Sequence, residues 1–338
     1  MQYALLHGVR DLRIEKKSIP KINSNQVLIK ISACGICGTD VLIYNGRIIT
    51  EIPYSPGHEF SGIVQSIGKN IQHLNVGDRV TVDPNCSCGF CYHCRRGNVN
   101  ICENLKKIKS KSNGGFAEYV SVPGNITYKI PDTISFEEAT LIEPLSCCIH
   151  IIEEANIKFG DFVVIIGGGT MGLILLQLAR QKGAGIIILS EPMEFKRELA
   201  LKLGADFVIN PTNESLFSFI KKINRSGANV VIEGIGLTET IKESIEVLNR
   251  KGTLVLAGLC SEDKTAIFSP CYIIKNEITI KGTFLNPFSF AKAIEQFSKI
   301  ITSPLITRIY YLSDINHAME EAEKSNQIKI IIKPTGDR

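Results

Sequence analysis

The chain has 338 residues, which is room for two domains of about 100 to 200 residues each. Hydrophobic residues make up 44% of it and charged residues 21%, a balance that excludes a disordered protein. Lysine and arginine number 38 against 34 aspartates and glutamates, and so small an excess does not indicate a nucleic acid or another polyanion as partner.

The first half of the sequence reads as β-structure. Residues 1–8 lack the basic start and the apolar stretch of a signal peptide, so we expect a cytoplasmic protein. Short runs rich in β-branched and aromatic residues follow, separated by turn residues, at 27–31, 76–82 and 116–120. These runs predict antiparallel strands of a barrel or a sandwich.

From residue 162 the pattern changes to alternating strands and helices. We expect strands at 162–166 and 186–190 and helices at 170–182 and 192–203, an alternation that predicts a doubly wound parallel sheet with right-handed crossovers. Further elements are expected as strands at 230–232, 253–256 and 328–332 and a helix at 290–298. The fold class is therefore α/β, joined to a second, all-β domain.

The stretch 162–179 allows one other interpretation. It is uncharged and mostly apolar, so a hydropathy window would flag it as a membrane span. Three adjacent glycines, Gly167 to Gly169, divide it. A strand, a glycine turn and a buried helix explain them better than a continuous helix in hydrocarbon.

The eleven cysteines are too sparse for a disulfide scaffold, and their number is odd. Metal ligands or thiols in a reducing compartment are the better interpretation. The spacing Cys88-x2-Cys91-x2-Cys94-x7-Cys102 lets four thiolates converge on one structural zinc ion. The alternative is a set of unrelated loop thiols or disulfides. Cys86 lies close enough to replace one ligand, but Cys88 gives the regular spacing.

A second set of metal-ligating residue types is scattered along the chain. Cys37, the pair His58 and Glu59, and Glu143 together offer the sulfur, nitrogen and oxygen ligands of a catalytic zinc site, which needs three protein ligands and one open position. Taken singly, a histidine or glutamate is more often a surface or hydrogen-bonded residue. Separation in sequence gives no reason for these side chains to meet.

The glycines Gly167-x-Gly169-x-x-Gly172 follow the expected strand directly and open the next helix. In this context they permit a tight turn, close approach of a pyrophosphate and close helix packing. Glu191 lies 19 residues after Gly172, at a position where a carboxylate can bind a ribose 2′-hydroxyl. A carboxylate there favours NAD over NADP, although Lys196 and Arg197 weaken that preference. Glu191 has an alternative role as a helix-start carboxylate. The expected cofactor-binding residues are Gly167, Gly169, Thr170, Met171, Gly172, Glu191 and Lys196.

Taken together, these motifs resemble those of zinc-dependent medium-chain alcohol dehydrogenases. The matching segments, in the family's order, are Cys37-Gly38-Thr39-Asp40, Gly57-His58-Glu59, the four-cysteine lobe, Gly114-Gly115-Phe116-Ala117-Glu118-Tyr119, Glu143-Pro144-Leu145-Ser146 and the glycine turn. The sorbitol, or polyol, dehydrogenase branch looks nearest, through Val82-Asp83-Pro84-Asn85 and Leu141-Ile142-Glu143-Pro144-Leu145-Ser146, with threonine dehydrogenase as a near neighbour.

The resemblance implies an architecture. It comprises a GroES-like catalytic domain over 1–145 with a structural zinc lobe at about 84–104, a Rossmann NAD-binding domain over 146–285, and a return of 286–338 to the catalytic domain. The active site would lie in the cleft between the domains. A homodimer or a homotetramer is typical of the family.

The resemblance also implies roles for single residues. Cys37, His58 and Glu59 would be ligands of a catalytic zinc, with Glu143 a fourth ligand or a partner of the metal's water, and Thr39 would pass the alcohol proton toward the nicotinamide ribose. Cys147 and Cys148 do not match ligand positions. Leu42 stands where the family often has a relay histidine, so the proton needs another exit. Tyr44 matches a tyrosine near the substrate in polyol enzymes, or is simply a buried aromatic residue.

The expected function is hydride transfer between a secondary alcohol or polyol and NAD, assisted by zinc. A threonine 3-dehydrogenase or a phosphorylated-polyol dehydrogenase is the alternative within the family. From a different class, the cysteine lobe with Lys106, Lys107, Lys109 and Lys111 beside it would be a zinc module that binds nucleic acid, and a zinc-free reductase on the same fold is a third possibility.

Overall fold

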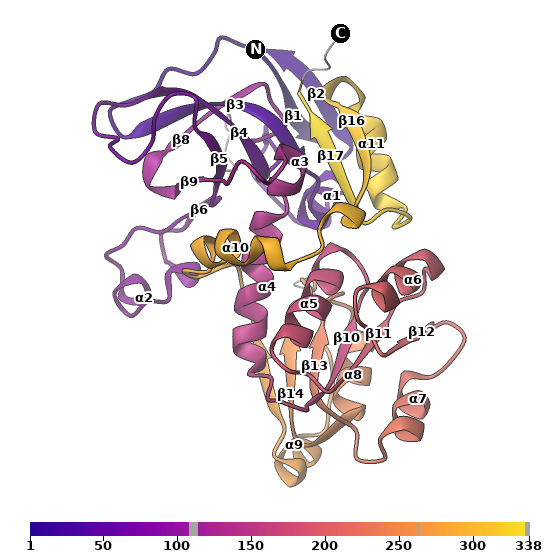
Figure 1. The fold of residues 1–338 in the computed structure, drawn as a ribbon. Helices are drawn as coiled ribbons and strands as arrows, with labels where there is room; N and C mark the ends of the chain where they lie inside the picture. The colour runs from indigo at the N-terminus through magenta and orange to yellow at the C-terminus, as the bar shows by residue number, and fades with distance from the viewer. Residues whose placement is uncertain (108–113, 262–263, 335–338) are drawn as a thin grey trace. The chain divides into compact units, whose positions relative to one another are not determined.

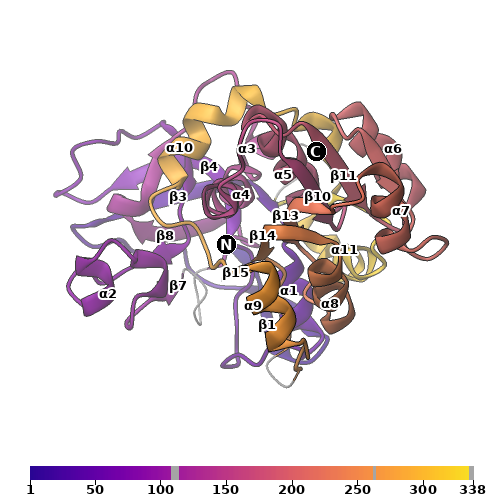
Figure 2. The ribbon, with the colours of Figure 1, turned by 90° about the horizontal axis from the view of Figure 1, so that it is seen from below.

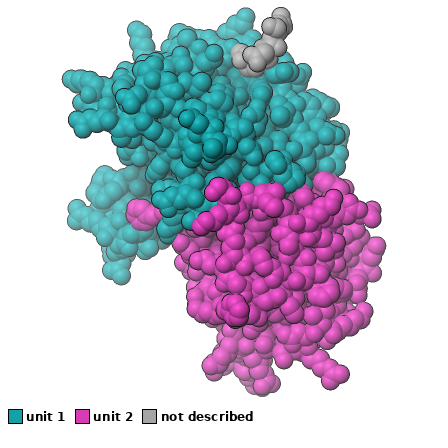
Figure 3. All heavy atoms as spheres, in the orientation of Figure 1, with its two compact units in different colours: residues 1–144, 290–297, 302–338 teal, residues 145–289, 298–301 magenta. Residues whose placement is uncertain are grey.

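The computed structural model describes residues 1–107, 114–261 and 264–334, and Figure 1 shows their course. The chain divides into two compact units, coloured separately in Figure 3. The first comprises Met1–Pro144, Phe290–Phe297 and Thr302–Arg338, and the second comprises Leu145–Ser289 and Ser298–Ile301. The C-terminal part of the chain thus belongs with the N-terminal part, and the two units are described separately below.

The first unit is built on a seven-stranded sheet around β3 (Gln26–Gly35). β3 pairs antiparallel with β4 (Glu59–Ile67), β8 (Tyr119–Pro123) and the C-terminal strand β17 (Lys329–Lys333). The other strands of the sheet are β5 (Arg79–Val82), β9 (Thr127–Lys129) and β16 (Ile306–Tyr311), and β1 (Gln2–Gly8) pairs with β2 (Asp11–Lys16) separately. Alternate side chains of β3, such as Val27, Ile29 and Ile31, enter the apolar core.

Short helices complete this unit. They are α1 (Gly38–Tyr44), α2 (Tyr92–Arg95), α3 (Phe136–Ala139), α10 (Phe290–Gln296) and α11 (Ile315–Glu323), and α4 (Ile142–Ala155) begins in it. Two expected strands begin three residues later than the sequence pattern predicted, at 79 and not 76 and at 119 and not 116. β5 starts at Arg79 because Gly77, with a φ of +93°, makes a turn closed by Asp78. β8 starts at Tyr119 because Phe116 and Glu118 pair with β1 instead.

The second unit holds a six-stranded, all-parallel sheet, which confirms the predicted α/β fold class. Its strand order is β12 (Phe207–Ile209), β11 (Ile186–Ser190), β10 (Phe162–Ile166), β13 (Ala228–Glu233), β14 (Leu248–Leu256) and β15 (Thr279–Gly282). The sequence order reverses between β10 and β13. Right-handed crossovers therefore place the helices after these two strands on opposite faces, as Figure 2 shows for α5 and α8.

The helices of this unit are α5 (Thr170–Gln181), α6 (Glu194–Lys202), α7 (Leu216–Ile223), α8 (Thr238–Glu246) and α9 (Pro270–Asn276), together with most of α4. The stretch 162–179 forms β10, the glycine turn and the first part of α5. Among the described residues no helix combines the length and the apolar character that a membrane crossing needs. The alternative interpretation of this stretch as a membrane span is therefore wrong.

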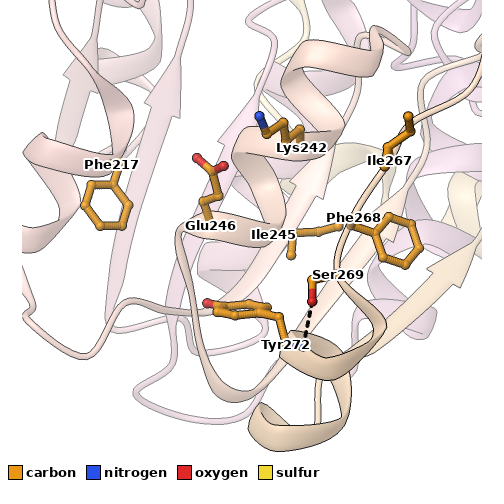
Figure 4. Close-up of a pocket in the computed structure, with 8 residues that line it drawn as sticks. All are labelled: Phe217, Lys242, Ile245, Glu246, Ile267, Phe268, Ser269 and Tyr272. Atoms are coloured by element: carbon orange, nitrogen blue, oxygen red, sulfur yellow. Dashed lines mark hydrogen bonds between the residues drawn. The ribbon is translucent and has the colours of Figure 1, made fainter.

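A cavity of about 670 Å³ lies among α7, α8 and the segment that precedes α9. Figure 4 shows its aromatic side chains, Phe217, Phe268 and Tyr272, with the charged Lys242 and Glu246. Lys242 and Glu246 lie in the second half of α8, and the chain continues from there into the start of β14. These two residues therefore lie toward the amino ends of the parallel strands. None of the residues that line this cavity is among those that the sequence analysis singled out.

Candidate metal centres and dinucleotide site

The four cysteines of the lobe come together in the first unit. Their ligand atoms lie within 4.8 Å of one another, with Sγ–Sγ distances of 4.0 Å between Cys88 and Cys94 and 3.9 Å between Cys91 and Cys102. A tetrahedral zinc with Zn–S bonds of about 2.3 Å requires sulfur atoms about 3.8 Å apart. Cys86, on β6 (Asn85–Cys86), is not part of this group. The four sulfur atoms therefore fit a structural zinc ion.

Backbone amides hold these sulfur atoms in place. The N–H groups of Cys91 and Cys94 donate to Sγ of Cys88 and Cys91, and those of Cys88 and Asn104 donate to Sγ of Cys102. Burial raises the pKa of Cys88, but amide donors from Phe90 and Cys91 outweigh it and lower that pKa to about 6. Burial raises the pKa of Cys86 to about 11. The thiolate, which is the form that binds a metal, is therefore favoured at Cys88, whereas burial raises the pKa of Cys94 to about 12.

A second group, Cys37, His58 and Glu59, also has its ligand atoms within 4.8 Å of one another. The register of β3 and β4 explains how residues 22 positions apart meet, because Gly35 lies directly opposite Glu59. Cys37 follows two residues after Gly35 and caps α1, so its side chain turns back toward the start of β4. His58 and Glu59 are buried and Cys37 is half-buried, and their imidazole, carboxylate and sulfur form a donor set that zinc accepts.

Asp40 supports two of these three residues, although the sequence analysis gave it no role. It is 1% exposed, its Oδ2 accepts a hydrogen bond of 3.1 Å from the Cys37 amide, and its Oδ1 lies 3.6 Å from Nδ1 of His58. At 3.6 Å the Asp40 carboxylate acts on the His58 ring as a nearby negative charge rather than as a hydrogen-bond acceptor. The spacing Cys37-x-x-Asp40, which forms a capping box, was the available signal.

Lys329 is the second residue that the sequence analysis missed. It lies on β17, nearly 300 positions from Cys37, and is 3% exposed. Its Nζ donates to Glu59 Oε2 at 2.5 Å and to the Ile36 carbonyl at 3.1 Å. Burial alone would lower the pKa of Lys329, but Glu59 and then Cys37 raise it above its ordinary value, so the ammonium form is favoured. Lys329 thus places a positive charge against one oxygen of Glu59.

The remaining residues named for this site have different surroundings. Glu143, at the start of α4, is buried and close enough to raise the pKa of Lys329, but it stands outside the three-residue group. The Thr39 amide donates to Cys37 Sγ.

Tyr44 lies under the Arg10 guanidinium, and burial and Glu320 raise its pKa. These surroundings favour the interpretation of Tyr44 as a buried aromatic residue. Cys148 packs against Met171 in the second unit.

The glycine turn in the second unit has the geometry of a phosphate-binding turn. Gly167 has a φ of +106°, which favours glycine, and a Cβ on Gly172 would collide with the Gly167 carbonyl. A Cβ on Gly169 would meet no atom within 4 Å, so open space lies in front of this residue at the start of α5. A helix amino end with this open approach fits the pyrophosphate of a dinucleotide.

Glu191 stands beside this turn, at the end of β11. It is 6% exposed, its Oε2 accepts from the Gly168 amide at 2.8 Å, and its Oε1 accepts from the Met193 amide at 2.9 Å. The carboxylate therefore fixes the turn that would hold the phosphates. Lys196, on α6, is 5% exposed, and burial lowers its pKa while Glu191 opposes that shift.

Fold and sites together define a class of protein: a parallel α/β nucleotide-binding unit joined to a β-unit with two metal-ligand groups, as in metal-dependent oxidoreductases. Residues 23–132 match the alcohol dehydrogenase GroES-like domain and residues 170–301 match the zinc-binding dehydrogenase family. The chain belongs to the zinc-dependent medium-chain alcohol dehydrogenase family. The predicted resemblance is therefore confirmed.

Individual relatives support this assignment along the whole chain. A sorbitol dehydrogenase of Bacillus subtilis is 35% identical, with 99% of this chain and 97% of the relative covered. A D-xylulose reductase of Saccharomyces cerevisiae is 38% identical, with 94% and 93% covered. A crystal structure of a zinc-binding dehydrogenase from Sinorhizobium meliloti, bound to NADP, is 34% identical and superposes with a TM-score of 0.95 over 98% of this chain and 99% of that one.

We predict that Cys94→Ser and Cys37→Ser each reduce the zinc content from two ions per chain to one, because each removes a thiolate from a different ligand group. Cys86→Ser is the matched control and should keep both ions, since Cys86 belongs to neither group. Elemental analysis of the purified variants measures this directly. Loss of zinc from the Cys86 variant would show that the ligand assignment in the lobe is wrong.

We predict that Lys329→Met destabilises the metal-free protein by about 3–5 kcal/mol, because without zinc it leaves the buried Glu59 carboxylate with no cation. Adding Glu59→Gln should restore much of that loss, since the uncompensated charge then disappears. The control is Lys333→Met on the same strand, where a half-buried pair with Glu137 is worth about 1 kcal/mol or less. Urea denaturation measures all four proteins, and equal losses for the two lysine variants would contradict the prediction.

Proposed function

We propose that this protein is a zinc-dependent dehydrogenase that transfers a hydride between a secondary alcohol or polyol and NAD. The observation that carries the proposal is the group Cys37, His58 and Glu59, which supplies three protein ligands of three kinds within 4.8 Å of one another. Three such ligands leave a fourth position of a tetrahedral ion for substrate. The glycine turn of the second unit supplies the complementary half of the reaction, a dinucleotide site.

A zinc ion in this group provides a Lewis acid for the oxygen of an alcohol, and a nicotinamide provides the hydride acceptor. The chain's own residues prepare that chemistry. Asp40 holds the Cys37 backbone and places a negative charge 3.6 Å from Nδ1 of His58, while Lys329 fixes one oxygen of Glu59. We assign to the Thr39 hydroxyl the first step of the alcohol proton's exit. Leu42 offers no imidazole for a further step, so the proton leaves by another route.

The structural role of the four-cysteine lobe belongs to the same proposal. A loop with little apolar core of its own gains its fold from the metal that its four thiolates hold. Family membership favours this role over a nucleic-acid-binding module, for which Lys106, Lys107, Lys109 and Lys111 were the predicted basic residues. Lys109 and Lys111 lie outside the described residues.

NAD is the proposed cofactor rather than NADP. The Glu191 carboxylate sits beside the glycine turn, where it can accept a hydrogen bond from a ribose 2′-hydroxyl and would repel a 2′-phosphate. The related Sinorhizobium meliloti protein is bound to NADP, so the choice needs its own test. Buried Lys196 is close enough to Glu191 to offset part of that repulsion.

A polyol is the proposed substrate class, because relatives that match nearly the whole chain are named for sorbitol and D-xylulose. Threonine and phosphorylated polyols are the alternatives. A reducing compartment such as the cytoplasm suits the many thiols, none of which forms a disulfide in the described chain. The homodimer or homotetramer expected from the family stays a prediction.

We predict that the purified protein reduces NAD in the presence of sorbitol, xylitol or arabitol, and that removal of its zinc lowers the rate by about 100-fold or more, since Lewis-acid stabilisation is worth several kcal/mol. Initial rates with these polyols, their phosphates and threonine identify the substrate class. Readdition of zinc is the control. Full activity after complete removal of both metal ions would refute the metal-dependent reaction.

We predict that Glu191→Ser shifts the ratio of kcat/KM values for NAD and NADP toward NADP by about tenfold or more, because a charged hydrogen bond worth about 1.5–3 kcal/mol is lost and a repulsion is removed. Glu194→Ser, three residues further along, serves as the matched charge control. An unchanged ratio in the Glu191 variant would assign cofactor selection to other residues.

A further inference from the structure

Glu233 is a fully buried carboxylate that neither the metal group nor the glycine turn accounts for. It is 0% exposed and ends β13. Its Oε1 accepts hydrogen bonds from the Ile235 amide at 2.9 Å, the Gly236 amide at 3.0 Å and the Thr240 hydroxyl at 2.9 Å, and its Oε2 accepts from the Gly236 amide at 3.1 Å. All these donors belong to the loop after the strand and to the first turn of α8.

Its place in the sheet is the point where the strand order reverses. Glu233 lies opposite Ile166 on β10 and Leu256 on β14. Ligands of doubly wound sheets bind at the carboxyl ends of the strands at such a reversal. The loop that Glu233 holds, residues 234–237, therefore borders the same edge of the sheet as the glycine turn.

The loop also contacts the glycine turn directly. The Gly234 amide donates to the Ile166 carbonyl at 3.0 Å, and Cγ1 of Ile235 lies 3.2 Å from the position that a Cβ of Gly167 would take. Ile235 remains 40% exposed, so part of its side chain faces out beside the turn. A change in the loop's backbone would thus change the wall next to the phosphate-binding residues.

A buried carboxylate is costly unless donors surround it, and here the loop's amides are those donors. Carboxylate and loop therefore depend on each other. Without Glu233, the buried Gly236 amide and the partly buried Ile235 amide lose their acceptor. The loop is also closely packed at Gly236, which has a φ of +82° and where a Cβ would collide with the Leu259 backbone.

We propose that Glu233 is a positioning residue for the dinucleotide: it fixes loop 234–237 against the glycine turn and so determines cofactor affinity without touching the cofactor. This inference rests on the proposed function, since it assumes that the second unit binds NAD. A positioning role predicts the direction in which dinucleotide affinity changes when the Glu233 carboxylate is removed. Charge alone implies that removing a carboxylate strengthens the binding of a doubly negative pyrophosphate, whereas loss of positioning weakens it.

The experiment measures binding of NADH to the zinc-loaded full chain by its fluorescence. Glu233→Gln keeps the shape but presents an amide group to backbone donors, and we expect its Kd for NADH to rise by about fivefold or more. Thr240→Val removes one of the donors and should give a smaller rise. Ser244→Ala is the control for stability, because it removes a buried hydrogen bond of α8 to the Thr240 carbonyl and leaves the loop's own contacts in place.

A second readout separates positioning from general destabilisation. Hydrogen exchange of the free protein should be faster at the Ile235 and Gly236 amides of Glu233→Gln and unchanged at β13 residues such as Val231. If Glu233→Gln fails to fold, NADH binding and hydrogen exchange of Thr240→Val provide the test. Unchanged or tighter NADH binding in variants with intact exchange at β13 would overturn the inference. If the unmodified protein itself binds no NADH, the proposed function fails instead.

Discussion

The antiparallel register of β3 and β4 is the constraint on which the metal group depends. Gly35 lies opposite Glu59, so the turn into α1 begins beside the first residue of β4, and Cys37 reaches the side chains of His58 and Glu59. The Glu59 carboxylate has space because residue 35 is a glycine. A Cβ at this position would collide with Oε2 of Glu59. A slip of the register by one residue would send the Glu59 side chain to the other face of the sheet and break the group apart.

The charges around that group come from distant parts of the chain. Asp40 acts through the start of α1, while Lys329 arrives on the C-terminal strand β17, which pairs with β3 one to two residues before Ile36. Each buried charge has a specific partner, as the low dielectric of the interior demands. The return of the C-terminal segment to the first unit therefore has a chemical consequence: it supplies the only described lysine in contact with Glu59.

Carboxylates organise the second unit in a similar way, but with backbone donors. Glu191 accepts amides from the glycine turn and the segment before α6, and Glu233 accepts amides from the loop before α8. Both stand at carboxyl ends of parallel strands, where successive N–H groups are not used by the sheet. Such amides either bind an anionic side chain or bind a ligand's phosphates. The two glutamates thus hold the glycine turn and the neighbouring loop 234–237.

The sequence by itself determined the local features. The apolar run and glycines at 162–172 specify a strand, a turn and a helix within one stretch of chain, and β10 and β11 begin and end at the residues expected. The cysteine lobe was equally accessible, because its four ligands lie within 15 residues. The sequence analysis placed the starts of β5 and β8 too early, because a glycine turn and pairing with β1, rather than residue type, set these boundaries. Only the tertiary structure decided which distant side chains meet: Lys329 with Glu59, Asp40 with His58, and Glu233 with its loop. The physical reason is that strand pairing and burial create these contacts, and neither periodicity nor spacing records which strand will lie beside which.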